Sequence, residues 1–551
     1  MLKVAVPLKG DRDRDMTKPI KDSAKPPQEP SWWRKYWFYT VLILLAVIGV
    51  PCAFFVPPLI PGLINDGNSI VSVRQGILAV LAGALTMLTL SETHRKNAQE
   101  KDKNERDHIR QVHAERRSRY TTAVGQLSSE KATIRLGGVY TLVGLIDEWL
   151  TDSVLSPEEL QKEGQVIVNN LCAYIRSPYP LAIKTKELQA DTEPDYYTGD
   201  FVMDQAALHE EQDVRRAIFD EMSKRSSTFT ENKDGEVTVI PGTWSDFDFD
   251  FSRAPIFYPL SNLTIEKSNF SSAKFYGDAN FFRTIFMQDA EFFGATFTQN
   301  ADFLDTTFTQ NDYFDGVNFA HDANFPFVTF SQEADFSQTT FTQDANFFFT
   351  NFNQKANFRN TSFIQTARFL NATFIQGADF YQATFKGSAD FHKVTFNEKA
   401  DFRGATFEQG AEFHDSFFKT QADFYKATFR ENIADFRRTT FHGYVDFSKA
   451  TFAQGASFES SVFFKHVSFW QAYFMNYRPA FAWRSSKARF SVYMDQQDSN
   501  FMVREDSQPI PMGTTALDGL HYCIPVGTVL FDPASWDEQQ KEYTRLSEPA
   551  Q

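Results

Sequence analysis

The sequence predicts a mainly β protein whose central part is a β-solenoid, preceded by a transmembrane hairpin of two helices and a small α-helical linker domain. Three observations lead to this prediction. Phe recurs from Phe270 to Phe474 in steps that alternate between five and six residues, which is a period of 11. Two apolar runs lie at 36–56 and 70–90. Residues 120–235 carry apolar side chains at helical spacing.

The Phe repeat is the strongest of these signals. About 38 successive lattice positions hold Phe, and a fixed period repeated so often indicates a solenoid. In the unit 378–388 each Phe follows a small residue two positions earlier, so both side chains lie on one face of an extended strand and the polar residue between them points outward. A helix is excluded, because these steps would scatter the Phe side chains around its circumference. One extra residue between Phe429 and Phe436 is the single break.

This pattern resembles the bacterial pentapeptide-repeat family, whose units read Ala-(Asn/Asp)-(Leu/Phe)-x-x. Ala-Asp-Phe at 378–380 and Ala-Thr-Phe at 383–385 match that motif, and the resemblance covers about 200 residues. It implies a right-handed, quadrilateral β-helix with Phe inside, here over 236–474. Because this chain adds a residue at every second corner, a coil needs about 22 residues rather than 20. We expect some nine coils and a rod of about 45 Å.

The first 90 residues predict a membrane anchor. Residues 1–35 are polar and contain Pro, which indicates a disordered tail. The runs 36–56 and 70–90 are each long enough to cross a bilayer. Arg74, the only charge in the second run, suits a side chain that snorkels to the interface, and an ion-pathway charge is the alternative. Since basic residues precede the first run and follow the second, we expect a multi-pass protein of the cell membrane with cytoplasmic N- and C-termini.

Residues 91–119 predict a helical stalk that continues from the second span. They contain no Gly or Pro and carry charges of both signs. Glu92 and Lys96 have the spacing of a supporting ion pair. Few apolar residues stand at heptad positions, so a strong coiled coil is not expected and weak self-association through the stalk remains an alternative.

The linker domain at 120–235 shows clear helix signals. Ser156-Pro157-Glu158-Glu159 has the pattern of an N-cap with a capping box, and the helix that it starts should stop before Pro178. A further helix is expected between about Gln205 and Lys224. The run that begins Arg119-Tyr120-Thr121 is similar to the linker of membrane-anchored bacterial pentapeptide-repeat proteins, which implies a shared layout.

Both ends of the solenoid differ from its middle. Phe247, Phe249 and Phe251 alternate with Asp residues and predict the first strand, while a calcium loop built on those Asp residues lacks the Gly and the distal Glu of an EF-hand. After Phe474 the repeat stops, and we expect 475–551 to be a C-terminal cap and tail that covers the open strand edges. This segment should end in a short helix from Asp532-Pro533 to near Leu546.

No motif in the sequence predicts a catalytic, cofactor-binding or metal site. Four His residues lie in corners or on outward positions of the repeat, each interpreted as standing alone: His392, His414, His442 and His466. Asp312 occupies an inward position two residues before Phe314 and is interpreted as a hydrogen-bonded defect of the core. Three widely spaced Cys residues indicate free thiols in a reducing compartment.

Surface charge is the feature most open to a functional interpretation. Residues 271–350 hold 11 acidic and 2 basic side chains, whereas 351–470 hold 12 and 14. Asp379, Asp401 and Asp423 should stack one coil apart, and this ladder is repulsive unless cations or a partner offset it. The plainer alternative is solubility, because a rod filled with Phe needs polar faces.

These observations favour a membrane-tethered cytoplasmic scaffold without catalytic activity. Its partners would be the lipid bilayer, through the two spans, and a protein on the solenoid faces, with self-association as a possibility. The net charge of −15 argues against direct binding of nucleic acid. The alternative is an acidic DNA mimic that acts on a type II topoisomerase or another DNA-binding protein, a role that the family resemblance brings with it.

Overall fold

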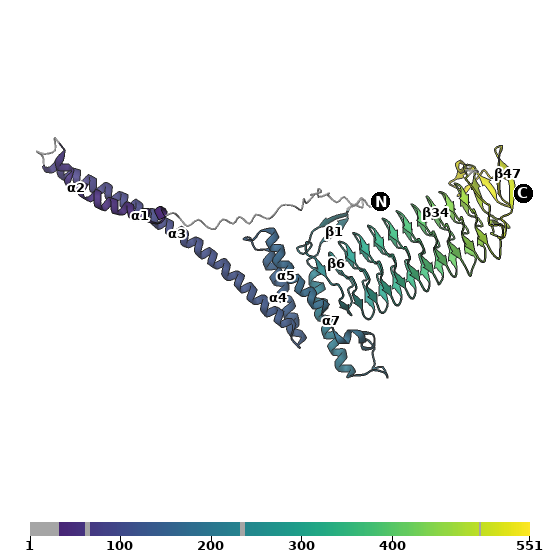
Figure 1. The fold of residues 1–551 in the computed structure, drawn as a ribbon, viewed down its shortest axis with the longest axis horizontal. Helices are drawn as coiled ribbons and strands as arrows, with labels where there is room; N and C mark the ends of the chain where they lie inside the picture. The colour runs from purple at the N-terminus through teal and green to yellow at the C-terminus, as the bar shows by residue number, and fades with distance from the viewer. Residues whose placement is uncertain (1–31, 61–66, 232–236, 495–497) are drawn as a thin grey trace. The chain divides into compact units, whose positions relative to one another are not determined.

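The computed structural model describes residues 32–60, 67–231, 237–494 and 498–551. Most of the predicted tail at 1–35 and part of the turn between the apolar runs lie outside these residues. The chain divides into two compact units, one within Val6–Arg119 and one that holds Tyr120–Gln551. Figure 1 shows the helices of the first unit and the helices and strands of the second.

The first unit contains two helices that are long and apolar enough to cross a membrane. One runs through α1 (Trp32–Leu44), a π-type turn (Leu45–Gly49) and α2 (Val50–Phe55). The π-type turn ends two residues before Pro51, which has no backbone N–H to continue the helical ladder. The other is α3 (Gly67–Leu127).

Two specific contacts join these helices among the described residues. A Cβ on Gly49 would stand only 2.7 Å from the Leu81 side chain, so the missing side chain lets the helices approach closely. Arg74 donates a hydrogen bond of 3.1 Å to the carbonyl of Phe54. Helix α3 runs without interruption through 91–119, but Glu92 pairs with Arg95 at 2.9 Å instead of with Lys96.

In the second unit, three helices pack against one another: α4 (Ala132–Leu150), α5 (Pro157–Arg176) and α7 (Phe201–Ser223). The capping box predicted at the start of α5 is present, since the Ser156 hydroxyl accepts from the N–H of Glu159 and the Glu159 carboxylate accepts from the N–H of Ser156. The helix predicted near 205–224 is α7. The ring centroids of Phe219, on α7, and Phe251 lie 4.7 Å apart, so the core of the helical domain continues into the first coil of the solenoid.

The solenoid runs from β3 (Phe249–Asp250) to β43 (Tyr473–Phe474) in strands of two residues. Its strands form four parallel sheets of 11, 11, 9 and 12 strands, which confirms a four-sided solenoid of about ten turns. Register partners lie 22 residues apart, as in Ala290 and Asp312, and 23 apart where the extra residue enters, as in Phe418 and Phe441. The predicted coil length and its one break are therefore confirmed (Figure 1).

The interior is a set of stacked Phe rings. Successive coils place rings about one strand spacing apart, for example 4.8 Å between Phe358 and Phe380 with planes 3° apart. Each ring is buried, and burial of one Phe contributes about 1.5–3 kcal/mol before the entropy cost of folding. Small hydroxyl residues in the core donate to carbonyls of the preceding coil, as Thr339 does to Phe314 at 2.5 Å.

After Phe474 the chain adds β46 (Arg489–Ser491) and β49 (Val529–Phe531) to the twelve-stranded sheet. The prediction of a helix from Asp532 to near Leu546 is wrong. The Asp532 side chain accepts from the N–H of Ala534 and closes a single 3-10 turn, and the chain then forms the antiparallel pair β50 (Trp536–Asp537) and β51 (Glu542–Tyr543). Aromatic contact across that pair, 4.9 Å between the Trp536 and Tyr543 rings, favours the strands over a helix.

Candidate functional site: the outer faces of the solenoid

The filled interior leaves the outer faces and corners of the solenoid for recognition. The Asp residues of the repeat triplets are structural there, because each accepts a hydrogen bond from the backbone N–H two residues later. Asp379 accepts from Tyr381 at 3.0 Å and Asp390 accepts from His392 at 2.9 Å. These bonds stabilise the corner that follows each inward Phe.

The predicted Asp ladder exists, and the chain supplies its own cations. Register pairs Asp379 with Asp401 and Asp401 with Asp423. Arg403 makes a bidentate ion pair with Asp401 at 2.5–3.0 Å and also reaches Asp423 at 3.6 Å. Lys399 lies 3.4 Å and 3.5 Å from the same two carboxylates. The repulsion is therefore offset within the rod.

Beside this ladder runs a column of cations and aromatic rings, called here the cation–aromatic column. Each member stands one residue after an inward Phe, except Lys449, which stands two residues after one. Arg359 lies 4.7 Å and Arg403 5.5 Å from the centroid of the Tyr381 ring. Farther along the rod, Lys449 lies 5.7 Å from the Tyr425 ring and 4.9 Å from the Trp470 ring. The column comprises Arg359, Tyr381, Arg403, Tyr425, Lys449 and Trp470.

The first half of the rod has a different surface. Residues 271–350 contain 2 basic and 11 acidic side chains, and Arg283 pairs with Asp305 at 3.0 Å. Two more acidic residues of this half pair with basic residues from the second half, Glu333 with Lys355 at 3.5 Å and Asp344 with Arg368 at 2.8 Å. The rod therefore carries an acidic half and a half of mixed charge.

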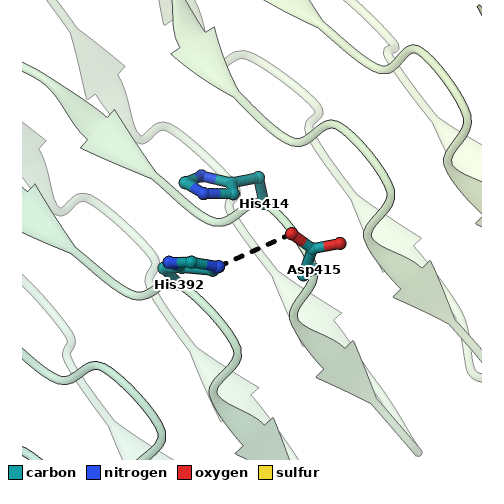
Figure 2. A group of neighbouring side chains, drawn as sticks. All are labelled: His392, His414 and Asp415. Atoms are coloured by element: carbon teal, nitrogen blue, oxygen red, sulfur yellow. Dashed lines mark ion pairs between the residues drawn. The ribbon is translucent and has the colours of Figure 1, made fainter.

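Two of the four His residues form a close pair, so the interpretation that each stands alone is wrong. Strand β28 (Ala389–Asp390) pairs in register with β32 (Ala411–Glu412), which stacks His392 on His414 with ring centroids 3.9 Å apart. Nε2 of His392 lies 3.5 Å from a carboxylate oxygen of Asp415 (Figure 2). The spacing of 22 residues, one coil, was the signal in the sequence. His442 and His466 stack instead on Phe464 and Tyr444.

Burial of His392 disfavours its charged form. Desolvation, together with the neighbouring His414, lowers the pKa of His392 below its ordinary value. Nδ1 of His414 is buried, and it lies 3.6 Å from a carboxylate oxygen of Asp435. The group can therefore bind a proton or a cation between its rings and carboxylates.

Asp312 is inward, as predicted, but among the described residues its side chain has no hydrogen-bond partner. It lies between Ala290 and Ala334 in the same column of the core and is fully buried. Neither carboxylate oxygen has a hydrogen-bond partner among the described residues. Desolvation, with a smaller effect of Asp289, raises the pKa of Asp312 well above its ordinary value, because burial disfavours the charged carboxylate.

Other candidate groups are paired. Asp248 and Asp250, from the Asp-x-Asp-x-Asp run, lie 2.8 Å from Lys267 and Arg176 respectively. A shallow pocket beside α4 and α7 is lined by Asp147, Glu221 and Arg225, among others. There the Arg225 guanidinium binds Asp147 at 2.7 Å and Glu221 at 2.6 Å, which ties these charges to one another.

The comparisons with known proteins bear on the repeat. Four overlapping segments match the sequence model of a family described as Pentapeptide repeats (9 copies): 336–384, 350–395, 380–428 and 391–440. The comparisons with curated proteins and with solved structures give no match. All four matched segments lie within the four-sided solenoid, where the coils stack in the register that the repeat predicts. The matched region, 336–440, therefore carries repeats of the kind that this family model describes.

Proposed function

We propose that this protein is a membrane-tethered scaffold without catalytic activity, whose solenoid binds a protein partner along the cation–aromatic column. The column is the observation that carries the proposal. Tyr, Trp and Arg are the residue types that dominate binding energy at protein interfaces. In the column they are held in a straight line by a rigid rod, so little conformational entropy is lost when a partner binds.

The charge of the column specifies the partner further. Each cation lies over an aromatic ring, and the Asp ladder beneath the column is paired within the rod: Arg359 lies 3.5 Å from Asp379, and Arg403 and Lys399 pair with Asp401 and Asp423. Lys449, which lies over the Tyr425 and Trp470 rings, and the exposed Trp470 ring therefore present positive charge and apolar surface on this face. A partner that presents acidic side chains and apolar groups along an extended surface would complement this face.

Tethering rests on the two helices of the first unit. Tyr36–Phe55 has a mean hydropathy of 2.4, and the apolar part of α3 reaches 1.7. With basic residues on both outer flanks, we propose a hairpin in the cell membrane with both termini in the cytoplasm. Reporter fusions at each terminus test this topology: both should report a cytoplasmic location, and a periplasmic or external signal from either would contradict it.

In-cell crosslinking of the intact protein tests the scaffold role. A variant with Tyr381→Ala, Tyr425→Ala and Trp470→Ala should lose the proteins that co-purify with the wild type. Phe327 and Phe349 are exposed aromatic side chains in the acidic half, and their replacement by Ala is the matched control, which should leave recovery unchanged. The proposal would be rejected if the triple variant, or the variant that lacks 240–480, recovered the same proteins as the wild type.

A DNA-mimic role is the second candidate, favoured only by the acidic half at 271–350. Some members of the family resemble duplex DNA in shape and charge and occupy type II topoisomerases. The mixed half beyond residue 351 and the apolar helices fit this role less well. Inhibition of gyrase supercoiling by the full chain in detergent would support it, and unchanged supercoiling would count against it.

A further inference from the structure

We propose that His392, His414 and Asp415 form a binding site for one divalent transition-metal ion of the zinc type. One ligand atom from each residue, two imidazole nitrogens and a carboxylate oxygen, lies within 4.8 Å of the other two. Figure 2 shows both rings and the carboxylate gathered at one corner of consecutive coils. This site is separate from the cation–aromatic column and goes beyond a scaffold role.

The solenoid fixes the ligands before an ion arrives. Backbone bonds between coils hold the corner, since the N–H of Lys393 donates to the carbonyl of His414 and the N–H of Asp415 donates to that of Arg437. The stacking of the rings at 3.9 Å follows from the ladder of β28 and β32. The site therefore needs only small side-chain rotations to close on an ion, and little entropy is lost on binding.

The donor set indicates the class of ion. Two imidazoles and one carboxylate suit Zn²⁺, Co²⁺, Ni²⁺ or Cu²⁺, whereas Ca²⁺ and Mg²⁺ prefer sites made of oxygen alone. Three protein ligands leave one position of a tetrahedral zinc site for water or for a group from a partner. Nδ1 of His414 is buried without a hydrogen-bond partner among the described residues, so it is a polar atom that a bound ion would satisfy.

Neighbouring charges set the strength of the site. Arg438 binds the Asp415 carboxylate at 2.7 Å and 2.8 Å, which orients the carboxylate in the way that hydrogen-bonded groups around metal sites do, while its positive charge opposes a cation. Lys393 adds a second positive charge one coil before Asp415. Asp390 and Asp435 on the flanking strands supply negative charge in return. We therefore expect reversible binding of moderate affinity rather than a permanently filled structural site.

Titration calorimetry with Zn²⁺ on the full chain in detergent micelles, without an affinity tag, tests the site. The wild type should bind one Zn²⁺ per chain at this cluster. The His392→Gln, His414→Gln double variant should lose that equivalent, and Asp415→Asn should weaken it about tenfold or more. The matched control is the His442→Gln, His466→Gln double variant, which removes two His residues that stack on aromatic rings and should keep the full affinity.

The result that overturns the proposal is specific. Binding of the same stoichiometry and affinity in the wild type and in the His392→Gln, His414→Gln variant would place the ion elsewhere, and absence of binding in the wild type would exclude the site. An unchanged affinity in Asp415→Asn would remove Asp415 from the ligand set. Far-UV circular dichroism of each variant should match the wild type, because the three side chains lie outside the Phe core.

Discussion

Replacing Asp312 by Ala should make the protein more stable. Asp312 occupies a column whose neighbours in the adjacent coils are Ala290 and Ala334, so Ala fits the site without strain. The carboxyl is fully buried, and neither oxygen is hydrogen-bonded among the described residues. A buried polar group without a partner costs about 1–3 kcal/mol, and we expect Asp312→Ala to raise the free energy of unfolding by that amount.

The gain should depend on pH in a definite direction. In the unfolded chain the carboxyl titrates near its ordinary pKa of about 3.9. Burial raises the pKa of the folded Asp312, so above about pH 4 the folded state keeps a proton that the unfolded state has released. Stability of the wild type therefore falls as pH rises from that value toward the pKa of the folded carboxyl. The advantage of Asp312→Ala should be larger at pH 7 than at pH 4.

Guanidinium denaturation of the full chain in detergent, followed by far-UV circular dichroism, measures the effect. Ala356→Asp is the matched control, since it places a carboxyl in the same column two coils later and should lower stability by a similar amount. A loss of stability in Asp312→Ala would refute the reasoning, because it would mean that the carboxylate has a stabilising partner in the folded protein.

Three other perturbations probe the core, the helical domain and the thiols. Phe380→Ala removes one ring from the stack and should cost about 3–5 kcal/mol in the same denaturation; a cost below about 1 kcal/mol would mean that the stack relaxes around the gap. Glu211→Gln breaks the buried ion pair with Arg215, 2.7 Å long, and should lower the thermal midpoint by an amount equivalent to about 3–5 kcal/mol, whereas an unchanged midpoint would mean that the other partners of Arg215 compensate for the lost charge. Burial raises the pKa of the Cys172 thiol to about 12, so at pH 8 a maleimide should label Cys523 and spare Cys172 until denaturant is added; rapid labelling of Cys172 would show that α5 opens readily.

Much of the solenoid can be predicted from the sequence, because every coil satisfies the same local rule. A large ring at one position and a small residue two before it fix which side chains point inward. Since every coil presents the same pattern, the register that stacks ring on ring is also the register that pairs the backbones. The extra residue between Phe429 and Phe436 lengthens one corner without shifting any ring out of the core. The capping box at Ser156 is local in the same sense.

The surface chemistry was decided by the tertiary structure, because residues 22 positions apart become neighbours about one strand spacing apart. His392 and His414 become a stacked pair, and Arg359 comes to lie over Tyr381, only when the coils are in register. Whether a buried oxygen finds a partner is equally non-local: Thr339 reaches the carbonyl of Phe314 in the preceding coil, while Asp312 reaches none among the described residues. The segment after Phe474 has no repeat to constrain it, so its pairing depended on contacts between residues far apart in the chain.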